Sequence, residues 1–170
     1  MSHRNEFVFK GAAVNVEGII SELGLEKHIE GGYYRRTFCS SRKAAGGSRQ
    51  AMASSIYYLL TQDNPVGHFH KNKSDILHFY HGEGVIRYHL ITDRGEYTQV
   101  EMGRDLKQGQ QLQLLVESGT WKASELVTGE FGLISEVVIP EFRFEDMTLA
   151  TLDQLKPWKD EIENLSRLIR

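Results

Sequence analysis

The feature that most constrains this fold is a succession of short strand patterns, each closed by a turn signal. We count about eight to ten such runs, with a turn signal about every 8–12 residues. The turns include Asp63-Asn64-Pro65 and Asp93-Arg94-Gly95, both rich in residues that reverse the chain. Helical periods do not alternate with these runs, so a parallel βαβ architecture is not expected. The pattern is typical of an all-β sandwich or barrel.

The predicted strands follow one another closely along the middle of the chain. They are expected at residues 33–38, 54–60, 66–70, 76–80, 85–92, 96–102, 112–116, 121–127 and 131–139. Asp93-Arg94-Gly95 should join two of them as a hairpin. Thr128-Gly129 lies between the last two strands, which predicts a second hairpin there.

A helical segment is expected at each end of the chain. Over residues 14–24 the apolar side chains follow the period of an amphipathic helix, and Gly24 would end it. A second amphipathic pattern covers residues 151–169 and is interrupted near its start by Pro157. We therefore predict one domain spanning residues 1–170, with its β core at about residues 30–145.

Length and composition narrow the class of protein. The chain has 170 residues, of which 40% are hydrophobic, as expected for one globular domain. A net charge of −3 gives no electrostatic signal for nucleic acid or for an anionic membrane. Cys39 is the single cysteine, which excludes an intrachain disulfide. Neither a signal peptide nor a membrane-spanning apolar run is present, so we expect a cytoplasmic protein.

The stretch from His68 to Gly82 holds four of the seven histidines and is the main candidate site. His68 and His70 are two residues apart, which places both imidazoles on the same face of a strand. Asp75 follows a polar turn, and a chain reversal there would bring its carboxylate in front of the two histidines. Such a set suits a divalent metal such as Zn, Fe, Mn or Ni. It suits proton transfer equally well.

The spacing of this stretch resembles the first motif of the cupins, which are jelly rolls of the double-stranded β-helix type. That motif has His-x-His, then an acid, then a glycine, and His68-x-His70, Asp75 and Gly82 keep its spacing. Residues 30–35, 74–80, 118–121 and 139–146 are similar to motifs of one cupin branch, small bacterial and fungal proteins of unassigned function. The resemblance covers about residues 15–150. It implies a single cupin domain that pairs as a homodimer.

Two positions depart from the metal-binding cupins. Their second motif places a histidine shortly after a Pro-x-Gly, whereas Glu117 and Lys122 stand at the proline and histidine positions of this chain. Asp75 is also one methylene shorter than the usual glutamate. The metal site that the resemblance implies would then consist of His68, His70 and Asp75 alone, beside a lysine that repels a cation.

Further residues are candidates for contact with a small molecule. Tyr58 is a candidate general acid. Arg35 and Arg36 alternate along a strand, so one of them should face inward and suit a phosphate or carboxylate, but the pattern does not decide which. The complete set of predicted substrate-binding residues is Tyr34, Arg35, Arg36, His78, Tyr88, Trp121 and Lys122.

Three functions follow as hypotheses. The first is binding of a sugar, sugar nucleotide or similar metabolite in the barrel pocket, without strong catalysis. The second is a metal-independent epimerase or isomerase, since the branch is related in fold to the dTDP-sugar epimerases; His68 or His70 would be the base and Asp75 its orienting partner. The third is a metal-dependent enzyme using His68, His70 and Asp75. For the homodimer, the strand at 33–38 could join the sheet edge of a partner.

Overall fold

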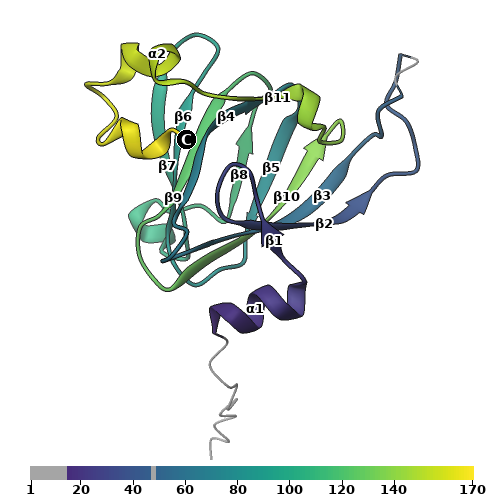
Figure 1. Ribbon diagram of the computed structural model, residues 1–170, viewed down its shortest axis with the longest axis horizontal. Helices are drawn as coiled ribbons and strands as arrows, with labels where there is room; N and C mark the ends of the chain where they lie inside the picture. Colours follow the sequence, from purple (N-terminus) through teal and green to yellow (C-terminus); the bar gives the residue numbers. More distant parts are fainter. Residues whose placement is uncertain (1–14, 47–48) are drawn as a thin grey trace, which may run out of the picture.

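Two antiparallel β-sheets form the body of the protein, seen in a computed structural model that describes residues 15–46 and 49–170 (Figure 1). The first sheet has six strands in the order β1-β2-β3-β10-β5-β8. Its strands are β1 (Glu26–Lys27), β2 (Tyr33–Cys39), β3 (Ser54–Thr61), β5 (Asp75–Tyr80), β8 (Gln113–Val116) and β10 (Phe131–Ile139). The predicted all-β architecture is therefore confirmed. Residue 14, the predicted start of the first helix, lies outside the described residues.

The second sheet has five strands in the order β11-β4-β9-β6-β7. Its strands are β4 (Val66–Asn72), β6 (Ile86–Ile91), β7 (Tyr97–Met102), β9 (Trp121–Leu126) and β11 (Met147–Leu149). β6 and β7 pair in register around Asp93-Arg94-Gly95, so the first predicted hairpin is confirmed. The second hairpin is wrong. β9 pairs with β4 and β6, and β10 pairs with β3 and β5, so the turn at Thr128-Gly129 leads from one sheet to the other.

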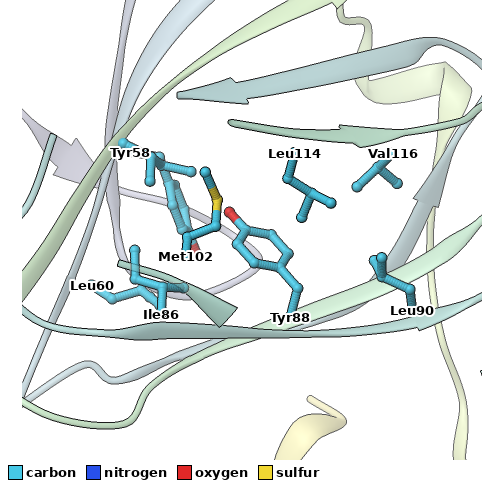
Figure 2. Packing of buried hydrophobic residues seen from close by; sticks show 9 residues of the cluster. Tyr58, Leu60, Ile86, Tyr88, Leu90, Met102, Leu114 and Val116 are labelled. Atoms are coloured by element: carbon cyan, nitrogen blue, oxygen red, sulfur yellow. The ribbon is translucent and has the colours of Figure 1, made fainter. Parts of the chain in front are cut away.

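An apolar core fills part of the space between the two sheets (Figure 2). We call this cluster the apolar core. Its fully buried members include Leu60, Ile86, Met102 and Ile134, none of which exposes any side-chain surface. Burying one such side chain contributes about 1.5–3 kcal/mol through the hydrophobic effect. The complete cluster is Tyr58, Leu60, Ile86, Tyr88, Leu90, Met102, Leu114, Val116 and Ile134.

The helix α1 (Val16–Leu23) lies below the barrel in Figure 1. The side chain of Asn15 caps it by accepting the Gly18 N–H at 2.8 Å, and Gly24 ends it in the left-handed conformation at φ 59°. Its buried residue, Ile19, packs in a cluster with Leu25 and Leu59. The predicted N-terminal helix is thus present and covers part of the first sheet.

The C-terminal segment is helical but not one continuous helix. It comprises α2 (Leu152–Leu155), followed by single 3₁₀ turns at Lys156–Trp158 and Leu165–Leu168. Pro157 accounts for the early break, since it has no N–H to continue the helical ladder. The apolar side chains of this segment pack on the outer face of the second sheet. Two further 3₁₀ turns lie at Leu106–Gln108 and Phe144–Asp146. Across the described ranges no helix is long and apolar enough to cross a membrane.

Candidate functional site

A cavity of about 480 Å³ opens between the two sheets. Its wall combines inward-facing side chains of six strands with two further segments, residues 26–30 and 141–145. The strand residues that line it are Tyr34, Arg36, Ile56, Tyr58, His70, Asn72, Ile76, Lys122, Glu136 and Val138. The segment residues are Glu26, His28, Glu30, Glu141, Phe142, Arg143, Phe144 and Glu145.

The floor of this cavity is built from two cross-strand pairs, one on each sheet. On the first sheet Glu136 of β10 lies directly opposite His78 of β5. On the second sheet Lys122 of β9 lies directly opposite His70 of β4. Facing residues in neighbouring antiparallel strands keep their side chains close together. The strand register therefore places four ionisable side chains close together between the sheets.

Lys122 connects the two sheets through its ammonium group. Its Nζ lies 3.3 Å from Oε1 of Glu136 and 3.0 Å from Nε2 of His78. All three side chains are buried, and His78 has no exposed surface. A buried charge is tolerated where it is paired and hydrogen-bonded, as it is here. We call Glu30, His70, His78, Lys122 and Glu136 together the cavity floor.

Glu30 reaches the floor from the connection between β1 and β2. Its Oε2 lies 3.2 Å from Nε2 of His70. His68 holds the backbone of this segment, because its Nδ1 and its backbone N–H both lie within 2.7 Å of the Glu30 carbonyl oxygen. Gly31 follows at φ 100°, and a Cβ there would collide with the Val66 carbonyl. The Glu-Gly-Gly sequence thus lets the chain turn tightly enough to insert one carboxyl group.

Burial drives the Glu30–His70 pair toward its neutral form. Desolvation raises the pKa of Glu30 to about 8, against the opposing effect of the Lys122 charge. Desolvation and then the same charge lower the pKa of His70 to about 3. The His70 Nδ1 lies 2.8 Å from the His68 carbonyl oxygen and must carry a hydrogen to donate there. Nε2 then carries a lone pair, which accepts a hydrogen bond from the protonated Glu30 carboxyl group.

The Lys122–Glu136 pair is held in its charged form. Burial alone would raise the pKa of Glu136, but the Lys122 ammonium and His78 outweigh it and keep the pKa well below the usual range. Burial lowers the pKa of His78, and its Nδ1 faces the Leu114 carbonyl oxygen at 3.3 Å. The floor therefore contains one neutral acid–imidazole pair and one ion pair, and its formal charges cancel.

Aromatic and charged side chains surround the mouth. The rings of His28 and Phe144 are nearly parallel, at 20°, with centroids 6.2 Å apart. Tyr34 meets His28 edge-on at 4.4 Å, and Phe142 meets Phe144 edge-on at 5.0 Å. Arg36 lines the same opening and donates to the Phe142 carbonyl oxygen at 3.0 Å. Flat apolar surface and basic groups are thus both available to a ligand that enters.

The structure does not bring the predicted triad together. His70 lies on the floor, but the β4 register is irregular between Gly67 and His70, so His68 does not share its face and instead binds the Glu30 carbonyl. Asp75 is exposed at the start of β5, and its Oδ1 accepts the Ser118 N–H at 2.9 Å. The physical reason is strand alternation: His78 faces inward, so Asp75, three residues earlier, faces outward.

These positions also test whether the predicted metal fits. The donors of His68, His70 and Asp75 point to separate partners, and the Lys122 ammonium already lies between His78 and Glu136. A cation of the same sign would be repelled there. Within the described residues, His, Cys, Asp and Glu form no group of three that could hold a metal ion. The side chains present do not fit a divalent metal, and we derive no step through one.

The remaining predicted residues divide between the cavity and its surroundings. Tyr34, Arg36 and Tyr58 line the cavity, and the Tyr58 hydroxyl donates to the Gly31 carbonyl oxygen at 2.9 Å. Burial raises the pKa of Tyr58 well above its usual value. The other predicted positions lie elsewhere: Arg35 is exposed, Tyr88 belongs to the apolar core, and Trp121 lies on the outer side of its sheet beneath the Lys71 ammonium.

Several cavity residues were missed in the sequence. Glu30 opens the Glu-Gly-Gly motif, and a carboxylate before two glycines is a signal that could have found it. Glu136 lies between Ile134 and Val138 in the inward-facing row of β10, where a charge among apolar residues marks a functional position. Phe142 and Phe144 fall in a motif that the resemblance had already singled out. His28 and Asn72 have no sequence signal of comparable strength.

Comparison with known proteins agrees with this architecture. Residues 17–150 match the model of the family described as "Cupin superfamily (DUF985)". The chain is 39% identical over 159 residues to the uncharacterized protein YML079W of Saccharomyces cerevisiae, covering 84% of this chain and 79% of that protein.

Solved structures extend the likeness to three dimensions. Protein SO0799 from Shewanella oneidensis is 32% identical with a TM-score of 0.83, covering 92% of this chain and 98% of that one. A hypothetical protein from Leishmania major is 27% identical with a TM-score of 0.80, covering 91% and 98%. Oxalate decarboxylase from Bacillus subtilis, at 16% identity and a TM-score of 0.54 over 86% of this chain and 38% of that one, shares the fold alone. The chain belongs to the DUF985 family of the cupin superfamily.

Proposed function

We propose that this protein binds a small polar molecule in the cavity between its two sheets. The observation that carries the proposal is the combination of a cavity of about 480 Å³ with a buried ionisable floor. Ligand sites are typically concave, largely preformed and supplied with a few convergent polar groups. A floor that served stability alone would be filled with apolar side chains, as the apolar core of the same barrel is.

A binding screen tests this proposal directly. Sugars, nucleotides and sugar nucleotides would be screened by thermal shift, because a ligand raises the stability of the state that it binds. Hits should weaken in Glu30→Gln, which alters the floor. They should be unchanged in the control Asp75→Asn, since Asp75 is exposed and lines no part of the cavity. Hits that respond to Asp75→Asn and not to Glu30→Gln would place the site elsewhere.

A second candidate function is metal-independent acid–base chemistry, of the epimerase or isomerase type. It is favoured by Glu30, whose pKa of about 8 lies near the pH at which most enzymes work. In this proposal Glu30 exchanges a proton with a carbon next to a carbonyl, and the neutral His70 at 3.2 Å orients the carboxyl group by accepting a hydrogen bond from it. Glu30 thereby takes the role of base that the sequence hypothesis gave to His68 or His70, and His70 becomes the orienting partner. Arg36 at the mouth would hold an anionic part of the substrate.

Solvent exchange tests the second candidate. Deuterium from heavy water should enter a dTDP-4-keto sugar at the carbon beside its carbonyl in the presence of the wild-type protein, and the rate should fall in Glu30→Gln. Exchange at the same rate with both proteins would rule out Glu30. The metal-dependent hypothesis stays a prediction with its own measurement. Elemental analysis for Zn, Fe, Mn and Ni after purification without an affinity tag should show a content that His70→Ala removes if that hypothesis holds.

We also propose that the protein forms a homodimer through β2. In the described chain β1 pairs only with Tyr33 and Tyr34, so the rest of β2 presents an edge without a strand partner there. Phe38 on this edge is 55% exposed. Exposed strand edges readily pair with another chain. Sedimentation should then give about twice the monomer mass of 19.4 kDa at micromolar concentration, and a monomer under those conditions would contradict the proposal.

A further inference from the structure

The ammonium group of Lys122 has one hydrogen-bond donor to spare. An ammonium carries three N–H groups. Glu136 accepts one at 3.3 Å and His78 accepts one at 3.0 Å, and within residues 15–46 and 49–170 these are its hydrogen-bond partners. Lys122 is only 6% exposed and lines the cavity. The third N–H is thus a buried cationic donor with room for a ligand beside it.

The position of this donor is fixed before any ligand arrives. His78 is held by β5, and its Nδ1–H faces the Leu114 carbonyl, so its Nε2 accepts from Lys122. Glu136 is held by β10, the neighbour of β5 in the first sheet, which faces the sheet that carries Lys122. Two acceptors on fixed strands orient the ammonium, and donors that need no reorganisation are the most effective at stabilising charge that develops in a reaction.

We propose that Lys122 anchors a carbonyl or carboxylate oxygen of the ligand, and that the ligand joins this group to a flat ring. The oxygen would accept the third N–H of Lys122 at the floor. The ring would lie among Tyr34, Phe142 and Phe144 at the mouth, where aromatic faces and edges are exposed to the cavity. The inference rests on the proposed binding function and names the chemical class of the ligand.

The same arrangement gives Lys122 a role if acid–base chemistry takes place. The ionised Glu30 carboxylate would remove a proton from the carbon next to the bound carbonyl. The C–H electron pair would form the C=C bond of an enolate, and the carbonyl π electrons would move to the oxygen held by Lys122. The proton would rest on Glu30 and return to the same face of the carbon, so this step exchanges the hydrogen with solvent, and inversion of the carbon would need a second acid on the opposite face. No redox partner or other co-reactant is required.

Two probes that share a ring isolate the contribution of the oxygen group. Phenylacetate carries a carboxylate, and 2-phenylethanol carries a neutral hydroxyl on a chain of similar length. Their affinities would be measured from chemical-shift changes in the protein's amide NMR spectrum. The wild-type protein should bind phenylacetate at least about tenfold more tightly than 2-phenylethanol, a difference of about 1.4 kcal/mol.

The decisive variant replaces both charges of the ion pair, Lys122→Met with Glu136→Gln. Lys122→Met alone would leave a buried carboxylate unpaired and risks unfolding, whereas the double variant keeps the floor neutral and close to its original volume. In it the preference for phenylacetate should fall to less than about threefold. The control variant Lys73→Gln removes a positive charge from a side chain that is 76% exposed and does not line the cavity, so the preference should survive there.

Each alternative result has a definite meaning. A preference that persists in the double variant, or that disappears in Lys73→Gln, would overturn the role of Lys122. Equal affinity of the two probes for the wild-type cavity would overturn it as well, while leaving small-molecule binding in place. Absence of any shift at cavity residues with either probe would overturn this inference alone, because the proposed binding function is judged by the separate metabolite screen.

Discussion

The apolar core and the cavity floor are two parts of one barrel interior, but the core buries mainly apolar side chains and the floor buries ionisable ones. Strand β10 contributes to both, with Ile134 in the core and Glu136, two residues later, on the floor. The core excludes water by close packing of mainly apolar side chains, and its Tyr58 hydroxyl donates to the Gly31 carbonyl oxygen. The floor buries charged and polar groups, and in the described chain no buried side-chain nitrogen or oxygen lacks a hydrogen-bond partner.

This difference separates stability from function within a single fold. Buried ion pairs are seldom more stabilising than apolar side chains of the same size, so their presence points to a role other than stability. The floor also leaves space beside its polar groups, whereas the core does not. We infer that the core holds the two sheets together and that the floor is maintained for a ligand. The following changes test that division, from the largest expected effect to the smallest.

The most damaging change should be Lys122→Met. It removes the cation from a buried pair and leaves Glu136 without its main partner, which typically costs about 3–5 kcal/mol of unfolding free energy. Urea denaturation would measure the loss. Adding Glu136→Gln should recover most of it, since the second change removes the unpaired charge. A double variant as unstable as the single one would show that packing rather than charge pairing governs the floor.

A substitution in the apolar core should cost almost as much stability and leave the ligand untouched. Leu60 has no exposed surface, and Leu60→Ala should lower the unfolding free energy by about 2–5 kcal/mol because it leaves a cavity. Affinity for any ligand of the floor should stay within about twofold of the wild type, at temperatures where the variant is folded. A large loss of affinity would break the separation between the two regions.

Glu30 should give the protein an unusual dependence on pH. Its pKa is about 8 in the folded state and 4.5 without burial, so its stabilising effect is complete below 4.5 and is lost as the pH rises through 8. His70, with its pKa lowered to about 3, loses its contribution in the opposite direction, as the pH falls below 6.5. Between pH 6.5 and 8 the Glu30 effect should therefore be visible by itself.

The measurement is urea denaturation across that window. The wild-type protein should lose on the order of 1–2 kcal/mol, given about 1.4 kcal/mol per pH unit for one proton. Glu30→Gln, a neutral substitute that can still donate to His70, should show a flatter profile. If the two profiles run parallel, burial of Glu30 does not control its protonation.

The smallest effect on stability should come from Phe144→Ala at the mouth. Phe144 is 55% exposed, and substitutions at such positions usually change the unfolding free energy by less than about 0.5 kcal/mol. Phenylacetate binding should nevertheless weaken, by about 3- to 10-fold, because one aromatic contact is lost. Unchanged affinity together with unchanged stability would remove Phe144 from the binding surface.

Most of the fold could be predicted from the sequence because strand length, alternation and turn chemistry are local properties. The nine predicted strands appear within two residues of their expected ends. The pairing of β9 with β4 and β6 was not predictable in the same way, since a turn signal shows where the chain reverses but not which edges then meet. The short strands β1 and β11 lacked a pattern long enough to read.

The site was harder to predict because it depends on register between distant strands. Alternation along β5 separates Asp75 from His78, and that part was available from the sequence. The contact of Lys122 with Glu136 depends on how two sheets face each other, which no local pattern encodes. Lys122 stands where the metal-binding cupins have a histidine, and in this protein it supplies the cation of the ion pair on the floor.

The cancelling charges of the cavity floor have a thermodynamic consequence. A neutral ligand can enter without changing the number of protons bound to the protein. An anionic ligand adds negative potential beside Glu30, which raises the proton affinity of a carboxyl group that is already close to half-titrated near pH 8. Binding should then draw protons from the solution. The heat measured by calorimetry should change with the ionisation enthalpy of the buffer, and the slope would count the protons taken up.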